Sequence, residues 1–298
     1  MQVIGRKVAV ACCRRSAEAD PTDLYPDPDA VALQAALREL GARSTLVAWD
    51  DPAAEWGSFS QVVVSSTWDS VDRPVEYLTW AHRVTAQSVL VNPAPVIEWC
   101  LDKVHQKGLA AAGVPTVATT WVTPKDTFTA LPAREFVVKP SVSAGGRSTA
   151  RYTPGDPAAF GHVRALQEVG QTVMVQEYLA KIDDEGEVDL VYFNGSFSHA
   201  VAKKPLLHAG EGVIDRPWER TAWGGLVAPS TDQLAVADLT LKVVADQVGC
   251  VPVYGRVDLV SGRAGEPLVL EVELIDPYLS LDMEPSAAGQ LAEAILRR

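Results

Sequence analysis

The first hundred residues alternate short, almost wholly apolar segments with segments of helical periodicity. Strands without a polar face are buried on both sides, as in a parallel sheet that helices cover on each face. We therefore predict a Rossmann-like parallel α/β domain over residues 1–99. No G-x-G-x-x-G follows its first strand, which argues against the usual nicotinamide-nucleotide site. The expected strands are residues 7–13, 44–49, 61–66 and 89–91, and the expected helices are residues 29–40 and 74–84.

Antiparallel hairpins replace this alternation after about residue 100. Asn194-Gly195 stands between the apolar runs 187–193 and 196–202, and this dipeptide supplies the two positive φ angles of a type I′ turn. Residues 100–298 are therefore predicted to be α+β, so the chain combines an α/β part with an α+β part. The further expected helices are residues 102–112, 157–169 and 231–248, and the further expected strands are residues 119–122, 135–139, 172–178, 253–260 and 268–275.

The charge balance restricts the partners of the chain. Its 298 residues include 38 acidic and 26 Lys or Arg residues, which gives a formal net charge of −12, and no run of Lys or Arg exceeds two. A net negative surface repels phosphate backbones, so we expect neither a nucleic-acid nor a membrane partner. No apolar stretch approaches the roughly 20 residues that span a bilayer. A secretory signal is not recognisable, and we expect a cytoplasmic protein.

Charged residues gather on one face of the second hairpin. Arg256 and Asp258 lie two apart on its first strand, and Glu271 and Glu273 lie two apart on its second strand, so each pair points to one face of the sheet. A turn centred near residues 264–265 would place Asp258 opposite Glu271 and Arg256 opposite Glu273, with Cβ atoms about 5 Å apart. The opposite face is expected to be apolar and to consist of Val257, Leu259, Leu270, Val272 and Leu274.

Three carboxylates in so small a space repel one another unless a cation joins them. Their hard oxygen atoms suit Mg²⁺, which usually takes one or two carboxylates together with substrate phosphates and waters. The alternative is a solvated acidic face that Arg256 balances. Because both strands are otherwise apolar, the face should be enclosed, and an unpaired buried carboxylate cluster is strongly unfavourable. We therefore expect Asp258, Glu271 and Glu273 to bind a metal.

A second group of residues suits a nucleotide. Lys139 ends an apolar strand, where its charge is unfavourable to desolvate unless it meets an anion. Ser143, Gly145 and Gly146 follow in a loop of small residues whose backbone N–H groups can approach phosphate oxygens. Gly-Gly turns are common, so this loop alone is a weak signal. Together with the lysine and the acidic cluster, it indicates a nucleoside triphosphate.

The strand at residues 172–178 ends in Gln176-Glu177-Tyr178-Leu179, and the acidic stretch 183–187 follows. Such a segment can supply backbone hydrogen bonds to an adenine edge and a carboxylate to ribose hydroxyls. By itself, an acidic stretch of this kind is more often a polar loop.

In this order, these residues resemble the ATP-grasp superfamily over roughly residues 100–298, with the preceding domain matching its usual N-terminal partner. The motifs are Lys103, Lys139 with its Gly-rich loop, residues 176–179, and Asp258 with Glu271-x-Glu273. The resemblance implies the ATP-grasp fold, with a lid subdomain at about 116–178 and a C-terminal catalytic subdomain at about 179–298. It also implies an ADP-forming ligase that makes a C–N bond and uses ATP and Mg²⁺, with Mn²⁺ as the alternative metal.

The roles of the superfamily carry over to the matching positions. Glu187 would hold the ribose, with Asp184 as the less favoured substitute. Most members have Asn in place of Glu273, and the extra charge should tighten metal binding. Arg256 and Lys203 would neutralise the transferred phosphoryl group. The implied ATP site is Lys103, Lys139, Ser143, Gly145, Gly146, Gln176, Glu177, Tyr178, Leu179 and Glu187, and the implied metal site is Asp258, Glu271 and Glu273.

Residues 136–147, 190–200 and 256–260 are similar to the ATP-grasp group that contains the D-cycloserine-forming O-ureido-D-serine cyclo-ligase. This resemblance implies an enzyme of antibiotic biosynthesis that activates the carboxylate of an amino-acid-like small molecule as an acyl phosphate. The substrate's own nitrogen would then close a five-membered ring. The alternatives are an intermolecular carboxylate–amine ligase and an ATP-binding module without catalysis. The intact lysines and acidic residues argue against the second of these.

The substrate pocket is expected between the two parts of the chain. Thr67 and Trp68 follow the carboxyl end of a parallel strand, where open α/β sheets bind ligands, although simple packing is the alternative for Trp68. His199 and His208 have no partner at a suitable spacing and are expected at solvated positions. Relatives in the superfamily often form dimers or tetramers, which leaves a homo-oligomer open.

Overall fold

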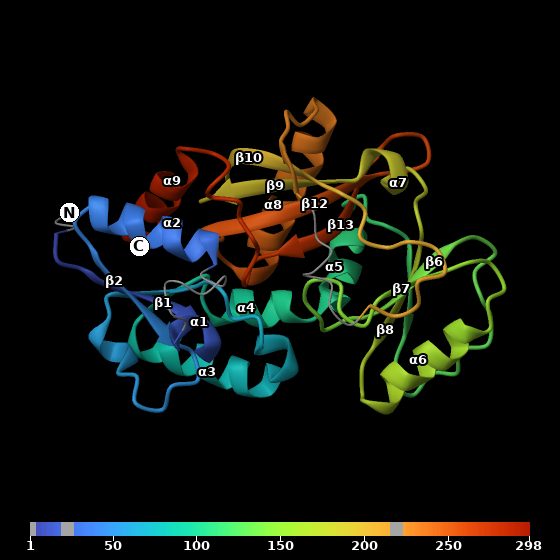
Figure 1. Cartoon of the computed structure of the whole chain (residues 1–298), viewed down its shortest axis with the longest axis horizontal. Coiled ribbons are helices and arrows are strands. Elements are labelled where there is room, and N and C mark those ends of the chain that lie inside the picture. The colour runs from blue at the N-terminus through green and yellow to red at the C-terminus, as the bar shows by residue number, and fades with distance from the viewer. Residues whose placement is uncertain (1–3, 19–26, 215–222) are drawn as a thin grey trace.

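The computed structural model describes residues 4–18, 27–214 and 223–298, which form three sheets and the helices that cover them (Figure 1). The N-terminal sheet is parallel and has the strand order β2-β1-β3-β4. The predicted parallel α/β architecture is confirmed, and the ends of the predicted elements differ from the observed ends by at most three residues. The strands are β1 (Lys7–Cys12), β2 (Arg43–Ala48), β3 (Gln61–Val64) and β4 (Val89–Val91), and the connecting helices include α1 (Arg14–Glu18), α2 (Pro28–Glu39) and α3 (Pro74–Gln87).

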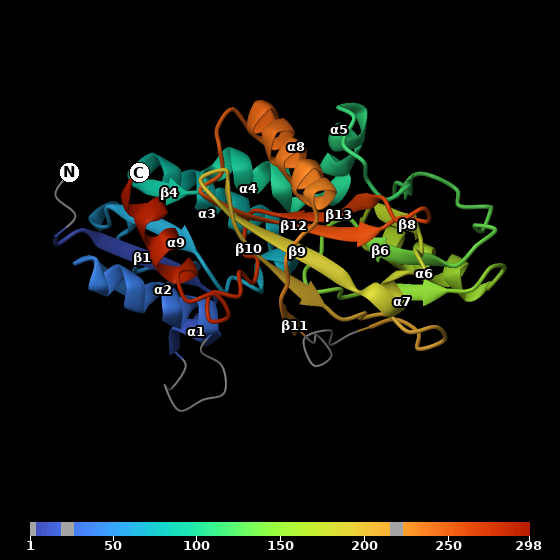
Figure 2. The same cartoon turned by 90° about the horizontal axis from the view of Figure 1, so that it is seen from above.

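Side chains of the N-terminal sheet point alternately into two cores, as strand geometry requires. Ala9 packs on the side of α3, whereas Val8 packs on the side of Leu33 in α2 and Leu291 in α9 (Ala287–Leu296). Figures 1 and 2 show α9 lying beside α2. The sequence analysis predicted no element after residue 275, so this helix was missed. The C-terminal helix therefore shares one hydrophobic core with β1 and α2.

A helical segment leads from the N-terminal sheet to the rest of the chain. It begins with α4 (Ala94–Leu101), which was not predicted and which runs through residue 99. The helix predicted at residues 102–112 is a 3₁₀ turn, Lys103–His105, followed by α5 (Gln106–Ala111). Asp102 caps this turn, because its carboxylate accepts a hydrogen bond from the backbone N–H of Val104 at 3.0 Å.

The lid sheet is antiparallel and has the order β5-β8-β6-β7. Helix α6 (Ala158–Glu168) covers one face, where its apolar stripe packs on the strands. Three of the strands and the helix were predicted, whereas β7 was not. The strands are β5 (Thr119–Val122), β6 (Phe136–Pro140), β7 (Ala150–Tyr152) and β8 (Val173–Glu177).

The large sheet has the order β11-β10-β9-β12-β13 and is also antiparallel. Helix α8 (Thr231–Val248) packs on one face, beside α4 and α5 (Figure 2). Asn194 and Gly195 have φ angles of 49° and 75°, so the predicted type I′ turn between β9 and β10 is confirmed. The strands are β9 (Glu187–Phe193), β10 (Ser196–Lys203), β11 (Trp223–Leu226), β12 (Tyr254–Ser261) and β13 (Pro267–Glu273), and the short α7 (Ile182–Glu185) precedes β9.

The predicted register of the β12–β13 hairpin is confirmed at its charged positions, where Arg256 pairs with Glu273 and Asp258 with Glu271. The register then shifts, so that Leu259 pairs with Val269 and Leu270 is the extra residue. The expectation that Leu270 lies on the apolar face is therefore wrong. A bulge breaks the strict alternation, and Leu270 lines a cavity instead.

Within the described ranges, no helix is both long enough and apolar enough to cross a membrane.

Candidate active site

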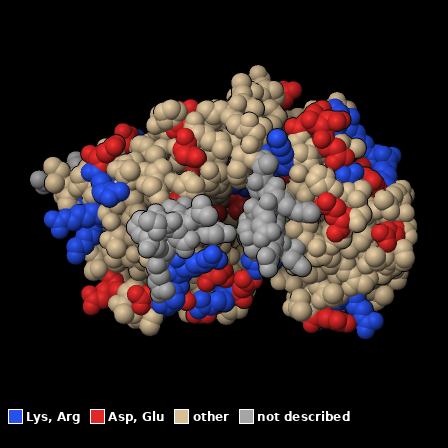
Figure 3. All heavy atoms as spheres, in the orientation of Figure 1, with Lys and Arg blue, Asp and Glu red and all other residues tan. Residues whose placement is uncertain are grey.

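A cavity of about 500 Å³ lies where the three sheets meet. Its wall includes Lys139 of the lid sheet, Arg256 of the large sheet and Trp68 of the N-terminal part. Figure 3 shows a hollow near the centre of the face that it displays, where basic and acidic side chains are interspersed around it. The structure brings most of the candidate residues together here: Lys103, Lys139, Ser143, Gly145, Gly146, Gln176, Glu177, Tyr178, Leu179, Glu187, Lys203, Arg256, Glu271, Glu273 and Trp68.

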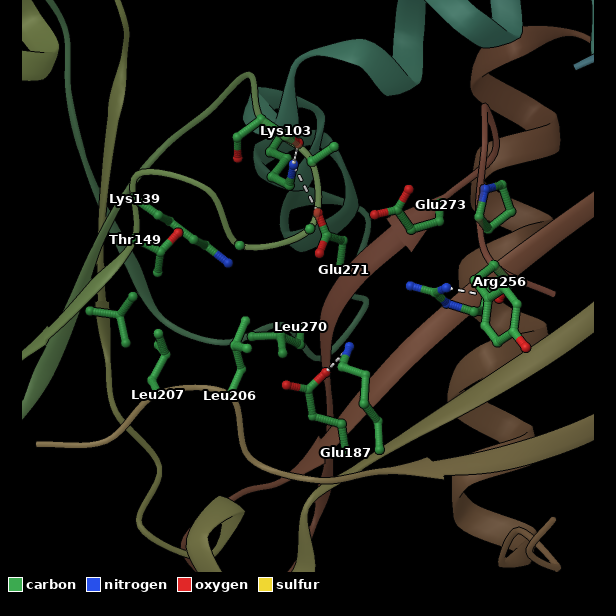
Figure 4. Close-up of a pocket in the computed structure, with 18 of the residues that line it drawn as sticks. Lys103, Lys139, Thr149, Glu187, Leu206, Leu207, Arg256, Leu270, Glu271 and Glu273 are labelled. Atoms are coloured by element: carbon green, nitrogen blue, oxygen red, sulfur yellow. Dashed lines mark hydrogen bonds and ion pairs between the residues drawn. The ribbon is translucent and has the colours of Figure 1, made fainter. Parts of the chain in front are cut away.

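Two lysines enter the cavity from one side (Figure 4). Lys103 is 8% exposed, lies 2.8 Å from Glu271 Oε1 and donates to the backbone oxygen of Ser143 at 2.6 Å. Lys139 differs, because its Nζ makes no hydrogen bond or ion pair with any residue that the structure describes. Burial therefore lowers the pKa of Lys139. The Lys139 ammonium group is therefore placed to bind an anion in the cavity.

The two glutamates of β13 have opposite electrostatic surroundings. Burial would raise the pKa of Glu271, but Lys103 and Lys139 outweigh it and lower the pKa to about 2. Burial and the neighbouring Glu271 raise the pKa of Glu273 to about 8. Glu271 is therefore a paired anion, whereas Glu273 needs a further positive charge to ionise fully at neutral pH.

A network of charged side chains from β9, β10 and β12 forms another part of the site. Arg256 donates to both oxygens of Asp258, from Nε at 2.7 Å and from Nη2 at 2.8 Å, and its Nη1 donates to the backbone oxygen of Tyr278 at 2.9 Å. Lys203 Nζ lies 2.5 Å from Glu187 Oε2 and 3.9 Å from Asp258 Oδ2. Burial would lower the pKa of Lys203, but the surrounding carboxylates outweigh it and raise the pKa. Both cations are thus held charged at the cavity wall.

The predicted metal residues are only partly adjacent in this arrangement. Asp258 is fully buried beneath Arg256 and does not line the cavity, whereas Glu271 and Glu273 do. Among the described residues, the group of three acidic side chains with oxygens within 4.8 Å of one another is Glu187, Asp189 and Asp258. The sequence analysis missed Asp189, although its position two residues after Glu187 on the same strand places both on one face.

The Gly-rich loop reaches from the lid towards both other sheets. Gly145 and Gly146 line the cavity with φ angles of 60° and 78°, a left-handed conformation that glycine adopts without strain. The neighbouring Arg147 forms an ion pair with Asp72 of the N-terminal part, with 2.5 Å between Nη1 and Oδ1. This ion pair therefore connects the Gly-rich loop of the lid to the N-terminal part of the chain.

The segment at the end of β8 forms another wall. Gln176 donates from Nε2 to Thr119 Oγ1 at 2.8 Å, and Glu177 forms an ion pair with Arg263. Tyr178 donates to Asp183 Oδ1 at 2.6 Å. Apolar side chains that the sequence analysis did not single out complete this end: Val117, Val137, Ile182, Leu206, Leu207 and Leu270. A flat apolar group such as a purine ring fits this lining.

The opposite end of the cavity belongs to the N-terminal part and to the segment after β13. Trp68 lines it and is 40% exposed, but Thr67 is fully buried and is not in the wall. Thr67 donates instead from its backbone N–H to Asp276, a cavity residue that the sequence analysis missed together with Asp27. Burial and the like charge of Asp27 raise the pKa of Asp276 to about 7, and no cation among the described residues forms an ion pair with it.

The two histidines behave differently. His199 is 5% exposed, and its Nε2 lies 2.9 Å from the backbone oxygen of Leu279, so the prediction of a solvated position is wrong. The prediction failed because the segment that covers β10 follows much later in the sequence. His208 is exposed, as predicted.

Comparison with known proteins decides the family. The chain is 36% identical to the cycloserine biosynthesis protein DcsG of Streptomyces lavendulae over 292 residues, which cover 94% of this chain and 96% of that protein. The chain belongs to the DcsG family. Its residues 8–92 also match the model of the N-terminal domain of D-cycloserine synthetase DcsG.

Solved structures place the DcsG family within the ATP-grasp fold. The crystal structure of D-cycloserine synthetase DcsG matches with a TM-score of 0.86 and 34% identity, over 98% of this chain and 99% of that chain. A D-alanine–D-alanine ligase from Bacillus anthracis complexed with ATP matches with a TM-score of 0.67 and 14% identity, over 98% and 97% of the two chains, which shows a shared fold. The predicted ATP-grasp fold is thus confirmed, and this DcsG-family chain is an ATP-dependent ligase.

Proposed function

We propose that this enzyme closes the ring of D-cycloserine from O-ureido-D-serine, with hydrolysis of ATP to ADP and phosphate. The observation that carries the proposal is the convergence of Lys103, Lys139, Arg256 and Glu271 on one cavity that also opens to the N-terminal part. The 36% identity to a cycloserine biosynthesis protein supports the substrate and a role in antibiotic biosynthesis.

The nucleotide would occupy the lid end of the cavity. Lys103 and Lys139 are placed to bind phosphate oxygens, and the loop with Ser143, Gly145 and Gly146 is placed to cover them. The purine would lie in the apolar end, with the backbone of residues 176–179 at its edge and Glu187 at the ribose. A fold relative has been solved with ATP, which supports ATP as the nucleotide.

The carboxylates around the cavity fit a divalent cation. Carboxylate oxygens are the ligands that Mg²⁺ prefers, and the raised pKa of Glu273 shows a site short of positive charge. Asp258, Glu271 and Glu273 would hold Mg²⁺, or Mn²⁺ as the alternative. When bound, the metal would neutralise negative charge on the ATP phosphates.

Residues of the chain position and neutralise the reacting groups. The γ-phosphoryl group moves from ATP to an oxygen of the substrate carboxylate, which leaves ADP and an acyl phosphate. Arg256 and Lys203, both held charged by buried carboxylates, face the negative charge of this group. The nitrogen bonded to the substrate's side-chain oxygen then attacks the acyl carbon and expels phosphate, which closes the ring. Hydrolysis of the carbamoyl group releases CO₂ and NH₃.

The N-terminal end of the cavity suits an amino-acid substrate. Asp27 and Asp276 offer carboxylates that form no ion pair with the part of the chain that the structure describes, and an α-ammonium group carries the complementary charge. Trp68 and Tyr278 lie in the same end of the wall and can flank the flat ureido group. The substrate carboxylate would then lie between this end and the phosphates.

Further parts of the proposal concern the organisation of the enzyme. The three sheets would correspond to an N-terminal domain over 1–99, a lid subdomain at about 116–178 and a catalytic subdomain at about 179–298. We also propose that the enzyme acts in the cytoplasm on a small molecule, without nucleic acid, and that it can form a homo-oligomer.

The test is release of ADP and phosphate with Mg²⁺ and O-ureido-D-serine as the only organic substrate, with products identified by mass spectrometry. Release confined to this substrate, accompanied by cycloserine, is expected, and its L-enantiomer and D-serine serve as controls. Phosphate release that requires a second amine would instead identify an intermolecular ligase. An absence of release with every substrate would contradict the proposal.

A further inference from the structure

Asp189 is a buried carboxylate beside the cavity that none of the roles above uses. It lies within β9, is 1% exposed, and neither of its carboxylate oxygens has a hydrogen-bond partner among the described residues. A buried acceptor without a partner costs about 1–3 kcal/mol, and more when it is charged. So unfavourable an arrangement indicates a partner that Asp189 acquires in another state of the site.

The charges around Asp189 do not balance. Lys203 is closest to Glu187, at 2.5 Å, and Arg256 is bound to both oxygens of Asp258. Asp189 is the third carboxylate of this set and lies farther from the same two cations, 3.9 Å from Lys203 Nζ and 3.5 Å from Arg256 Nε. Burial and the nearby Asp258 accordingly raise the pKa of Asp189 to about 7. The set carries one more acidic group than it has cations.

The carboxylate oxygens of Asp258 have two competing roles, which are to bind Arg256 and to bind the proposed metal. In the structure, both oxygens accept hydrogen bonds from Arg256. The role in metal binding proposed above requires at least one of them for the cation. The pairing of β12 with β9 places Asp189 directly opposite Asp258, so a second carboxylate lies within reach of the same guanidinium. A small rotation would turn the 3.5 Å contact between Arg256 Nε and Asp189 Oδ2 into a hydrogen bond.

We propose that Asp189 is a positioning residue. It accepts the hydrogen bonds of the Arg256 guanidinium when the carboxylate of Asp258 binds a divalent cation. Arg256 then stays charged and aimed at the phosphoryl group, while Asp258 is released for the metal. After the exchange each positive charge has its own carboxylate, namely Lys203 with Glu187 and Arg256 with Asp189. This inference rests on the proposed function, because it assumes a metal-dependent nucleotide site.

The test compares ADP binding with and without Mg²⁺ by calorimetry in the wild type and in Asp189→Asn, which keeps the shape and removes the charge. Without Mg²⁺, the two proteins should bind ADP equally, because Asp189 does not line the cavity. With Mg²⁺, the variant should bind ADP about 10- to 100-fold more weakly, since Arg256 retains Asp258. The melting temperature of the nucleotide-free variant should not fall, because the removed carboxylate is buried, accepts no hydrogen bond from the described residues, and has only long ion-pair contacts of 3.5 and 3.9 Å.

Two further variants separate this role from others. Asp246→Asn removes a carboxylate that is 69% exposed on α8 and should behave as the wild type. In an Arg256→Met background, Asp189→Asn should have no further effect on binding with Mg²⁺, because Asp189 acts through Arg256. The same measurement is repeated with Asp189→Ser, which serves as a second variant if the side-chain amide of Asp189→Asn disturbs folding.

Equal strengthening of ADP binding by Mg²⁺ in the wild type and in both Asp189 variants would overturn the inference. So would a full effect of Asp189→Asn in the Arg256→Met background, which would identify Asp189 as a direct ligand. Weaker ADP binding without Mg²⁺ together with a lower melting temperature would show a merely structural role. A wild type that binds no ADP under any condition would instead remove the proposed function, and the inference with it.

Discussion

Replacing Lys139 by methionine should weaken ATP binding and leave the nucleotide-free protein at least as stable as the wild type. The lysine ends β6 and reaches into the cavity, where the described residues offer its Nζ no hydrogen bond or ion pair (Figure 4). Burial lowers its pKa because the ammonium group loses water without gaining a counterion. Methionine has a similar length and flexibility, so the substitution removes the charge and little else.

The two effects have estimable sizes. A hydrogen bond to a charged group contributes about 1.5–3 kcal/mol, so the loss of one lysine–phosphate contact corresponds to roughly 10- to 150-fold weaker ATP binding. In the free protein, the unfavourable burial of the ammonium group disappears. One kcal/mol corresponds to about 2–4 °C in a domain of 150–250 residues, so the melting temperature should stay the same or rise by about 3 °C.

Calorimetric titration with ATP and thermal unfolding without nucleotide measure these effects. Lys242→Met is the matched control, because Lys242 is 73% exposed on α8 and pairs only with Asp246 among the described residues. Its ATP affinity should equal that of the wild type. A Lys139→Met protein that melts at a lower temperature and binds ATP as tightly as the wild type would refute the reasoning, since Lys139 would then be a structural residue.

Three further predictions concern other parts of the fold. Glu271→Gln removes the charge that holds Lys103 at 2.8 Å, and phosphate release should slow by about 10- to 100-fold; turnover within threefold of the wild type would contradict this. Burial lowers the pKa of His105 to about 4, so its neutral form contributes stability above pH 6.5 that is lost as the pH falls from 6.5 to 4. His105→Phe, which keeps the stacking on Trp99, should therefore unfold in urea with a smaller loss of stability between pH 7.5 and pH 5, and an unchanged loss would show that His105 does not titrate there. Asn92→Ala removes three buried hydrogen bonds, to the backbone of Val253, Tyr254 and Leu274, and should lower the free energy of unfolding by about 3 kcal/mol in urea titrations; a loss below about 1 kcal/mol would count against this estimate.

Local patterns were sufficient wherever one element and its neighbour in the sequence decide the structure. The register that pairs Arg256 with Glu273 follows from the period of two and a short connection, and the structure has it. The bulge at Leu270 did not follow, because nothing in a hairpin sequence marks where one extra residue breaks the alternation. Leu270 was therefore assigned to the wrong face.

Candidate site residues show the same division. Lys139 could be singled out, because a charge at the end of an apolar strand is unusual in any fold, and Glu271 could be singled out from the two-residue spacing of the hairpin. Lys103 followed only from the resemblance to the ATP-grasp superfamily. Asp27 and Asp276 could not be linked, since they lie about 250 positions apart in the chain and only the packed structure brings both to one cavity. The direct bond between Asp258 and Arg256 was likewise not predicted, because i and i+2 side chains on one face do not reveal which of them pair.

The sequence by itself determined the parallel and antiparallel parts of the chain, the hairpin turns and the residue types of an ATP-grasp site. These features depend on backbone preferences and on apolar periodicity, which act over a few residues. Only the tertiary structure decided that α9 packs on the N-terminal sheet, that His199 is buried, and that Asp189 lies near two cations without a hydrogen bond from any described residue. Burial and electrostatic pairing depend on distances between segments remote in the chain, and those distances exist only after the sheets have packed.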